Sequence, residues 1–537
     1  MCDHDLNNKS ILNNNAHDLE HKKWNRRSFL QALGLAGAGS MMLGGMPVSA
    51  STNSKLAAAI SNSETDRILV IIRLKGGNDG LNTIVPIYDY DTYASYRPSI
   101  KHNLSQVTQL NSDFGMPNYM NDLLNLWDNG AMKVIHGVGY EDSSQSHFAG
   151  SDIWASTDAG NNTQSGWLGR HFEELYPEYL INPPSTPAAV QIGSIGNLIF
   201  QGDTNNYAFS VANPNQLETI AQNGAVHDMS NFPDCIYGEQ LEFMRGTTNT
   251  TYQYAGTIHD AYSEGINSFE YMDSDLGRQL SIVAKLIKGN LGTKVYMVTL
   301  GSFDTHANQV ENQRDLLIDL SNTIKTFYDD LASSGFDDKV LSMTISEFGR
   351  RAFENGSNGT DHGKAAPMLL FGPAIDSNGF VGEHPDLENL DTNGNLNYTQ
   401  DFREVYATIM EDWLCIDSGL VNEALLNQNY NRLDLGISCN SLSVGNPSFD
   451  NNRFKHYVIY SNQDVILKIN TPITQHTVIK LYDIMGREIG TLKNEMLFAG
   501  EHSINVKNAI GRKLNIGQYI YRISTNQQNY SKSLIIN

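Results

Sequence analysis

DRILVIIRLKGGNDGLN, residues 66–82, is the segment from which the architecture of this chain follows. Its apolar run lacks polar alternation, which predicts a strand buried on both faces, as in a parallel sheet covered by helices. A glycine-rich turn that contains Asp79 follows the run directly. Ligands of open parallel sheets bind beyond the carboxyl ends of the strands, so this turn marks the edge at which a site is expected.

Similar apolar runs recur along the chain and alternate with amphipathic helical patterns. The alternation predicts an α/β fold, a three-layer αβα sandwich with a mostly parallel sheet over 66–435. Residues 155–275 are less periodic and richer in Asn, Gly and Tyr, and we interpret them as a cap or insertion. The remaining predicted strands are 131–140, 293–300, 339–345 and 368–372, and the predicted helices are 120–130, 276–290, 313–335 and 399–414.

The chain changes character at about residue 450, where short apolar segments are separated by Asn, Gly and Pro. This pattern predicts an antiparallel β-sandwich at 453–537, joined by a linker at 436–452. The turn DIMGREI, followed by LNIGQYIYRI, resembles the C-terminal sorting domain of type IX secretion cargo from Bacteroidetes. A generic carbohydrate-binding or immunoglobulin-like domain is the alternative.

The N-terminal segment KKWNRRSFLQALGLAGAGSMMLGGMPVSA, residues 22–50, has the composition of an export signal. A basic stretch precedes a short Gly/Ala-rich run that ends in a small-residue cleavage site, VSA. The RRSFL motif resembles a twin-arginine signal, which implies a cleaved segment 1–50, a linker at 51–65, and export of the folded protein through the periplasm to the cell surface or the medium. A membrane anchor is the alternative, although the run is short and glycine-rich for a stable span.

The composition limits the classes of partner. The 537 residues suffice for two or three domains. A net charge of −22 argues against nucleic acid and an anionic membrane surface as partners, because both would repel the chain. Four cysteines are too few for a disulfide framework or a thiolate metal site, and their spacing leaves a Cys415–Cys439 bridge undecided.

Acidic, histidine and serine side chains stand beside five of the predicted strands. Because the carboxyl ends of parallel strands share one edge, we expect these side chains to meet. Carboxylate and imidazole groups suit a divalent metal ion such as Zn, Mn, Ca or Mg. Each motif alone is common, and their joint placement is what predicts a metal site. The candidate metal ligands are Asp79, Asp304, His306, Glu347, Asp361 and His362, and the candidate catalytic residues are Ser146, His147 and Arg350.

Six motifs, in order over about residues 66–430, resemble the uncharacterised bacterial domain family 1501: LKGGNDGLNTIVP, SHFAGSDIW, SGWLGRHFE, FDTHANQ, SEFGR and GTDHGKAAPMLLFG. That family is similar to the alkaline phosphatase superfamily, which includes sulfatases. The resemblance implies an alkaline phosphatase-like fold and an exported, metal-dependent hydrolase of phosphate or sulfate esters. It also implies an anionic ester or polysaccharide as substrate, with the twin-arginine and type IX machinery as export partners.

The resemblance further implies roles for individual residues. Ser146, at the expected N-terminus of a helix, would be the nucleophile and would share one metal ion with Asp79. Asp304, His306 and His362 would hold a second metal ion. The family pattern thus distributes two ions over the loops that follow the strands.

One position departs from the superfamily pattern. Phe348 stands where a metal-binding histidine is expected, and phenylalanine cannot bind a metal ion. Glu347 or Asp361 is the candidate replacement. The alternative function is therefore a catalytically degenerate surface-binding or scaffold protein that keeps the fold and at most one metal site.

Three further assignments stay open. Ser143 and Ser144 compete for the role of nucleophile. His147 is a ligand, a general acid or a packed core residue. Arg350 either pairs with a phosphate or sulfate oxygen or holds Glu347 in place.

Overall fold

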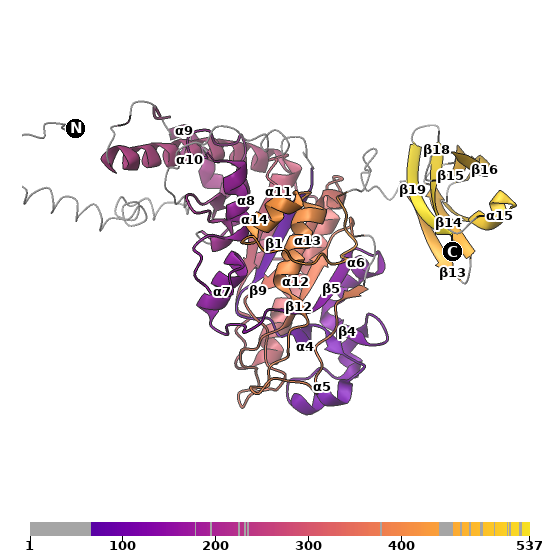
Figure 1. Cartoon of the computed structure of the whole chain (residues 1–537), viewed down its shortest axis with the longest axis horizontal. Helices are drawn as coiled ribbons and strands as arrows, with labels where there is room; N and C mark the ends of the chain where they lie inside the picture. The colour runs from indigo at the N-terminus through magenta and orange to yellow at the C-terminus, as the bar shows by residue number, and fades with distance from the viewer. Residues whose placement is uncertain are drawn as a thin grey trace, which may run out of the picture. The chain divides into compact units, whose positions relative to one another are not determined.

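The computed structural model of the protein describes residues 66–536 with short gaps, at 178, 194–195, 224–225, 230–231, 233–235, 376–378, 440–454, 462–463, 472–473, 484–486, 499, 513, 515–516 and 526–528. The predicted signal segment and the linker after it lie outside the described residues. The chain forms two compact units, a larger one that ends at Ser441 and a smaller one that comprises Leu442–Asn537 and the short segment Ala332–Gly335 (Figure 1). Within the described residues, no helix has both the length and the apolar character needed to cross a membrane.

A central sheet, nine-stranded within the described residues, organises the larger unit. Its strands are β1 (Ile68–Leu74), β5 (Met132–Gly139), β6 (Ala189–Ile192), β7 (Ala208–Val211), β8 (Val295–Leu300), β9 (Val340–Ser346), β10 (Ala366–Phe371), β11 (Gly379–Val381) and β12 (Gln400–Asp401). They lie in the order β11-β5-β10-β9-β1-β8-β6-β7, with β12 beside β5. β1 pairs in parallel with β8 and β9, which explains why its apolar run has no exposed face.

One strand runs against its neighbours. β10 is antiparallel to both β5 and β9, whereas β1, β6 and β8 make parallel pairs. A strand that runs in reverse has its first residue at the edge where its neighbours have their last. The segment that precedes β10 therefore meets the loops that follow β5, β8 and β9.

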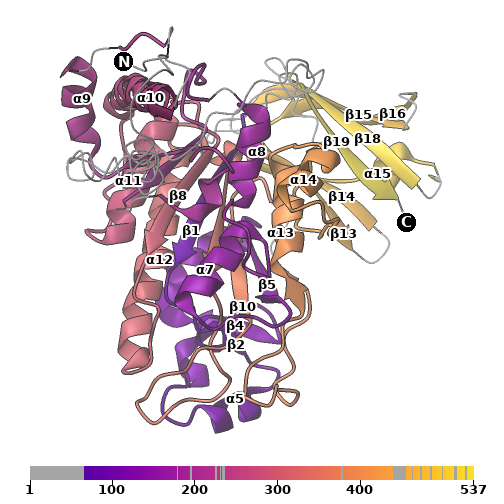
Figure 2. The same cartoon turned by 60° about the vertical axis from the view of Figure 1, so that its left-hand side comes forward.

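Helices cover both faces of the sheet (Figure 2). The crossovers from β5 to β6 and from β8 to β9 run in opposite directions, and right-handed connections place their helices on opposite faces. On one face Trp154 stacks on Phe402, and Trp167 stacks on Tyr406. That face carries α7 (His147–Ser156), α8 (Trp167–Leu175) and α13 (Phe402–Thr408), and the other carries α11 (Asp275–Lys288) and α12 (Gln309–Ala332).

The remaining elements of the larger unit are short or peripheral. A second sheet has the order β2-β4-β3. The elements are β2 (Val85–Pro86), β3 (Val107–Gln109), β4 (Phe114–Pro117), α4 (Gly80–Thr83), α5 (Tyr90–Tyr96), α6 (Leu124–Asp128), α9 (Leu217–Asn223), α10 (Ile236–Glu264) and α14 (Ser418–Ala424). The three-layer α/β architecture predicted from the alternating pattern is confirmed.

Part of the segment interpreted as an insertion belongs to the main sheet. β6 and β7 continue the sheet beyond β8 with parallel pairing. Each has four residues, too few for a periodic signal, so the sequence pattern did not reveal them. The helix expected at 399–414 is also divided, into β12, α13 and a π-helical turn at Ile409–Trp413.

The smaller unit contains two antiparallel sheets. Its elements are β13 (Lys455–Ser461), β14 (Asp464–Thr471), β15 (Gln475–Asp483), β16 (Glu488–Leu497), β17 (Gly500–Asn505), α15 (Val506–Ile510), β18 (Gly517–Thr525) and β19 (Asn529–Ile536). The sheet orders are β13-β14-β17 and β16-β15-β18-β19. Leu467 of the first sheet shares a core with Leu481 and Tyr521 of the second. The predicted antiparallel β-sandwich is therefore present.

A disulfide joins Cys415 to Cys439, a pairing that the spacing alone left undecided. Arg67, just before β1, donates hydrogen bonds to the carbonyls of Asp412 at 2.8 Å and Ser438 at 2.7 Å. The bridge and this arginine together fasten the end of the larger unit to the start of its central strand.

Candidate metal centre

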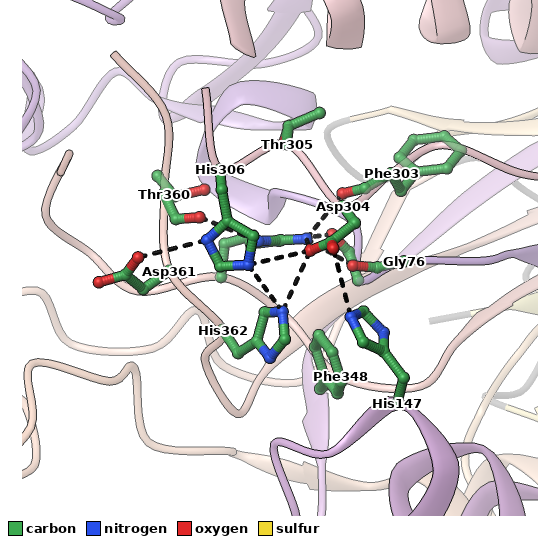
Figure 3. A network of polar contacts seen from close by, with 12 residues as sticks. Gly76, His147, Phe303, Asp304, Thr305, His306, Phe348, Thr360, Asp361 and His362 are labelled. Atoms are coloured by element: carbon green, nitrogen blue, oxygen red, sulfur yellow. Dashed lines mark hydrogen bonds and ion pairs between the residues drawn. The ribbon is translucent and has the colours of Figure 1, made fainter. Parts of the chain in front are cut away.

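Loops from four strands meet at one edge of the central sheet (Figure 3). Asp304 and His306 follow β8, and Glu347 follows β9. His147 is the first residue of α7, which follows β5, and His362 precedes the reversed strand β10. The topology thus gathers side chains that are up to about 200 residues apart in the sequence, as in the contact of His147 with Glu347.

Asp304 lies at the centre of this cluster. Its Oδ1 lies 3.1 Å from Nε2 of His306 and 3.1 Å from Nε2 of His362, and its Oδ2 lies 3.4 Å from Nε2 of His147. Arg350 donates to the same Oδ1 at 2.7 Å. Partial burial opposes the negative charge, but the hydrogen bond and the positive charge of Arg350 help to outweigh it and lower the pKa of Asp304 to about 2. At neutral pH a carboxylate therefore faces three imidazole nitrogens.

The other nitrogen of each imidazole faces a hydrogen-bond acceptor. An acceptor at Nδ1 holds the proton there, so we assign the lone pair of each neutral ring to Nε2. Burial also lowers the pKa of His362, which favours its neutral form. The pairs are His147 Nδ1 with Glu347 Oε1 at 3.1 Å, His362 Nδ1 with the Gln145 carbonyl at 2.7 Å, and His306 Nδ1 with Asp361 Oδ1 at 3.3 Å.

The inward-facing nitrogens crowd one another. Nε2 of His306 and Nε2 of His362 are 3.0 Å apart, and two lone pairs at this separation repel unless a cation or a proton lies between them. A tetrahedral zinc ion with bonds of about 2.0 Å keeps its ligand atoms roughly 3.3 Å apart, close to this spacing. Ligand atoms of His147, Asp304 and His362 also lie within 4.8 Å of one another.

The donor set selects among metal ions. Imidazole nitrogens with one carboxylate suit Zn²⁺ and similar borderline ions, whereas Ca²⁺ and Mg²⁺ prefer sets made of oxygen. Asp304 and His306 are 44% and 45% exposed, so an ion and a ligand can reach them from solvent. Glu347 and Asp361 bind the outer nitrogens of the histidines, as the outer partners of metal-binding imidazoles do.

Phe348 packs beneath the imidazoles. It is buried, and its ring centre lies 5.1 Å from that of His147 and 4.4 Å from that of His362. The position that departs from the superfamily pattern thus supplies an apolar wall to the cluster. Among the described residues, His147, Asp304 and His362 form the one group of three or more potential ligands.

Arg350 has a different role from the anion contact considered from its sequence. Its guanidinium is fully buried and donates to the backbone carbonyls of Gly76, Gly77, Phe303 and Thr360 as well as to Asp304. A buried side chain with these partners has no face for a phosphate or sulfate oxygen. Arg350 holds Asp304 in place and ties the loops after β1 and β8 to the segment before β10.

Asp79 is separated from the cluster of potential ligands. Its side chain is buried, and Oδ2 accepts from Arg97 at 2.6 Å and from the amide of Gln309. Its place after β1 was predicted correctly. The predicted role was that of a metal ligand, whereas in the structure Asp79 forms an ion pair with Arg97. Arg97 lies in none of the six motifs, and Gln309 is the last residue of FDTHANQ, but spacing along the chain does not indicate that either one contacts Asp79.

The three candidate nucleophiles differ in exposure. Ser143 is buried, and the Oγ of Ser144 accepts a hydrogen bond from the backbone N–H of Ser146 at 3.3 Å. Ser146 is exposed and precedes α7, yet its hydroxyl does not cap the helix. It also stands between Gln145, the carbonyl partner of His362, and His147. Of these three residues, Ser146 is the most exposed.

Two glycines allow the loops to approach this closely. Gly76 has a φ of +124°, and a Cβ added there would lie 2.3 Å from the backbone nitrogen of Asp304. A Cβ at Gly359 would lie 2.3 Å from the backbone carbon of His306. Any larger residue at either position would push apart the loops that carry the histidines and Asp304.

An open pocket of about 670 Å³ adjoins the cluster at Asp304. Its walls come from the loop after β8, from the segment before α11 and from the helix α12. Apart from Asp304, its polar lining consists of hydroxyl, amide and carboxylate groups. The lining residues are Met272, Ser274, Ser302, Asn312, Asp315, Leu316 and Asp319.

The fold and the cluster define a three-layer α/β domain with a candidate histidine-rich metal centre at the carboxyl edge of its sheet. Residues 66–412 match the family model described as "Protein of unknown function (DUF1501)", and the chain belongs to that family. The family resemblance drawn from the six motifs is therefore confirmed. None of the curated proteins compared with the chain matches it.

Solved structures of the alkaline phosphatase superfamily are similar to the chain at a low level. A superfamily protein from Vibrio parahaemolyticus shares 8% identity with a TM-score of 0.28, covering 80% of each chain. The PsFucS1 sulfatase from Pseudoalteromonas shares 9% identity with a TM-score of 0.30, covering 84% of this chain and 86% of that one. At these values the likeness carries no information about substrate or mechanism.

Proposed function

We propose that this protein is a metal-dependent hydrolase of phosphate or sulfate esters with one metal ion, most compatible with Zn²⁺. The observation that carries the proposal is the convergence of three imidazole Nε2 atoms on the Asp304 carboxylate, each with its Nδ1 held by an acceptor. Such a set of lone pairs and negative charge is stable when a cation lies among them.

His147, Asp304, His306 and His362 would hold the ion, which supplies positive charge to attract an anionic ester and to stabilise its oxygens. Ser146 Oγ would attack phosphorus or sulfur as the ester bond to the alcohol breaks, and the alcohol leaves with the proton that the serine gives up. Water then releases phosphate or sulfate and restores the serine. The position of Ser146 at the start of α7 adds the positive end of a helix dipole to the site.

The pocket beside Asp304 suggests the nature of the alcohol. Asp315 and Asp319 in its wall would repel an anionic leaving group, whereas the exposed amide of Asn312 can bind hydroxyl groups. A sugar ring that carries one ester group suits this combination. We therefore favour an esterified polysaccharide over a multiply charged metabolite.

The first test is elemental analysis of the purified full-length chain, prepared without added metal. We expect about one equivalent of zinc or a similar ion, and none in a His147→Gln/His362→Gln variant. An equal, near-zero metal content in both folded proteins would rule out the metal centre. Assays with generic phosphate and sulfate esters, with Ser146→Ala as the control, then decide the reaction.

Phe348 favours one alternative, a surface-binding or scaffold protein that keeps the metal ion without catalysis. Its ring occupies the position of an expected ligand and leaves one group of potential ligands among the described residues. Zinc in the parent protein together with ester turnover that is unchanged by Ser146→Ala would favour this alternative.

We also propose that the protein is exported in two steps, by the twin-arginine route and then by type IX secretion to the cell surface or medium. The RRSFL motif, the DIMGREI motif and the C-terminal β-sandwich support this proposal. N-terminal sequencing of the protein recovered from cells and medium is the test. A protein that retains residues 1–50 and stays in the cytoplasm would contradict it.

A further inference from the structure

A buried glutamine connects the two loops that carry most of the metal centre. Gln309 is the first residue of α12, and its side chain is fully buried. Its Oε1 accepts hydrogen bonds from the hydroxyl of Thr305 at 3.2 Å and from that of Thr360 at 2.6 Å. Thr305 lies between Asp304 and His306, and Thr360 stands two residues before His362.

The amide nitrogen of Gln309 anchors this contact to the interior. It donates to Oδ2 of Asp79, which is paired with Arg97 in a buried ion pair. The backbone continues the connection, because the N–H of Gln309 donates to the Asn358 carbonyl at 3.0 Å, and the N–H of Thr360 donates to the Thr305 carbonyl at 3.2 Å. One side chain thus spans the loop after β8, the segment before β10 and the turn after β1.

We infer that Gln309 is a positioning residue, which sets the separation between the loop that carries Asp304 and His306 and the segment that carries His362. The inference rests on the proposed metal centre for its functional meaning and on the contacts of Gln309 for its physical basis. It gives Asp79 and Arg97 a role as the buried support of Gln309. The outer contacts of metal ligands typically affect metal affinity by 10–100-fold.

The chain provides a matched control one helical turn away. Gln313 is also buried on α12, and its amide donates to the Asp79 carbonyl at 3.0 Å. It contacts the turn after β1 and accepts a hydrogen bond from the Gln309 amide at 3.3 Å, but it contacts neither Thr305 nor Thr360. Gln309→Met and Gln313→Met therefore remove the same group from the same helix face, and each leaves buried polar partners behind.

The test compares both variants of the full-length protein by zinc affinity, by the absorption spectrum of the cobalt-substituted protein and by hydrogen exchange. We expect Gln309→Met to weaken zinc binding by about 10–100-fold, to shift the cobalt spectrum and to speed exchange in 303–306 and 359–362. Gln313→Met is expected to speed exchange around residues 78–83 and to leave zinc affinity and spectrum unchanged. The inference would be overturned if the two variants weakened zinc binding equally. It would also be overturned if Gln309→Met left hydrogen exchange unchanged in 303–306 and in 359–362.

The exchange measurement separates this inference from the metal centre itself. A parent protein that binds no zinc would end the proposed function, yet hydrogen exchange would still decide whether Gln309 holds the two loops together. Zinc binding that is equally tight in the parent and in Gln309→Met would leave the proposed function standing and refute the positioning role.

Discussion

Two clusters of histidines in the same domain show how packing differs from a binding arrangement. His147, His306 and His362 surround a carboxylate and have acceptors at their outer nitrogens. His136 and His384 lie instead among aromatic rings, where His136 stacks on Phe380 and contacts Phe114, with ring centres 4.9 Å and 4.4 Å apart.. A cluster of histidines alone therefore does not identify a binding site. The two clusters differ in the groups that the imidazole nitrogens face.

Electrostatics separate the clusters in the same way. Burial lowers the pKa of His136 to about 3 and that of His384 to about 4, and the charge of Asp89 offsets only part of the loss of water at His384. His136 has a buried Nε2 without a hydrogen-bond partner. These two rings are neutral packing elements, whereas the three rings around Asp304 point their lone pairs toward a common centre.

The largest expected effect comes from the same substitution made in both clusters. His362→Gln should weaken zinc binding by more than about 100-fold, because a direct ligand contributes more than an outer partner, and should change stability little. His136→Gln should leave zinc affinity unchanged and lower the free energy of unfolding by about 2 kcal/mol, because it buries an amide among aromatic rings. Chelator competition and urea unfolding measure the two quantities. Equal losses of zinc affinity would remove the distinction between the clusters.

The packed histidines should also make the protein sensitive to acid. Their folded pKa values lie below the unfolded value of 6.5, so the unfolded chain binds more protons below that pH. The free energy of unfolding should therefore fall as the pH drops from about 6.5 toward 4, by up to about 1.4 kcal/mol per pH unit for each histidine. His136→Phe should flatten this dependence, as measured by urea unfolding at several pH values. An unchanged slope in the variant would show that His136 is not a source of the effect.

A smaller effect is expected from the acceptor behind His147. Glu347→Gln keeps an oxygen for the Gly76 N–H and for His147 but removes the negative charge, so zinc affinity should fall by about tenfold. Glu354→Gln is the matched control, since Glu354 also accepts backbone N–H groups, from Ser99 and Ile100, but contacts no histidine. A tenfold loss in the control would point to net charge rather than to the contact with His147.

Most of the α/β framework could be predicted because its strands are apolar on both faces. The run at 68–74 has no polar alternation, and all but Arg73 of its side chains are buried in the parallel sheet. β6 and β7 were missed because four residues give no periodicity. The reversal of β10 left no mark on its sequence either, although it is what carries His362 to the edge where the other strands end.

The sequence indicated which residues lie at the site, but it indicated few of the contacts that they make there. Asp304 and His362 stand next to strand ends that the apolar pattern located. The pairing of Asp79 with Arg97 and the burial of Arg350 depend on loops packed in three dimensions, for which spacing along the chain carries no signal. The role of a residue whose partners are backbone carbonyls is especially hard to predict from sequence. Every residue has such a carbonyl, so the partner leaves no signal in the sequence.

The smallest expected effect concerns Phe348. The prediction tests whether its ring supports the imidazoles as an apolar wall or only stands where a metal ligand is missing. If its ring holds the imidazoles of His147 and His362 in place, Phe348→Leu should weaken zinc binding roughly threefold, within the 0.5–1.5 kcal/mol of an aromatic pair. Phe327→Leu, in the buried face of α12, should cost similar stability with zinc affinity unchanged. Equal zinc affinity in Phe348→Leu and the parent would mean that the rings around Asp304 are held by their polar partners alone. In that case polar contacts alone would position His147, His306 and His362, whereas aromatic packing positions His136 and His384.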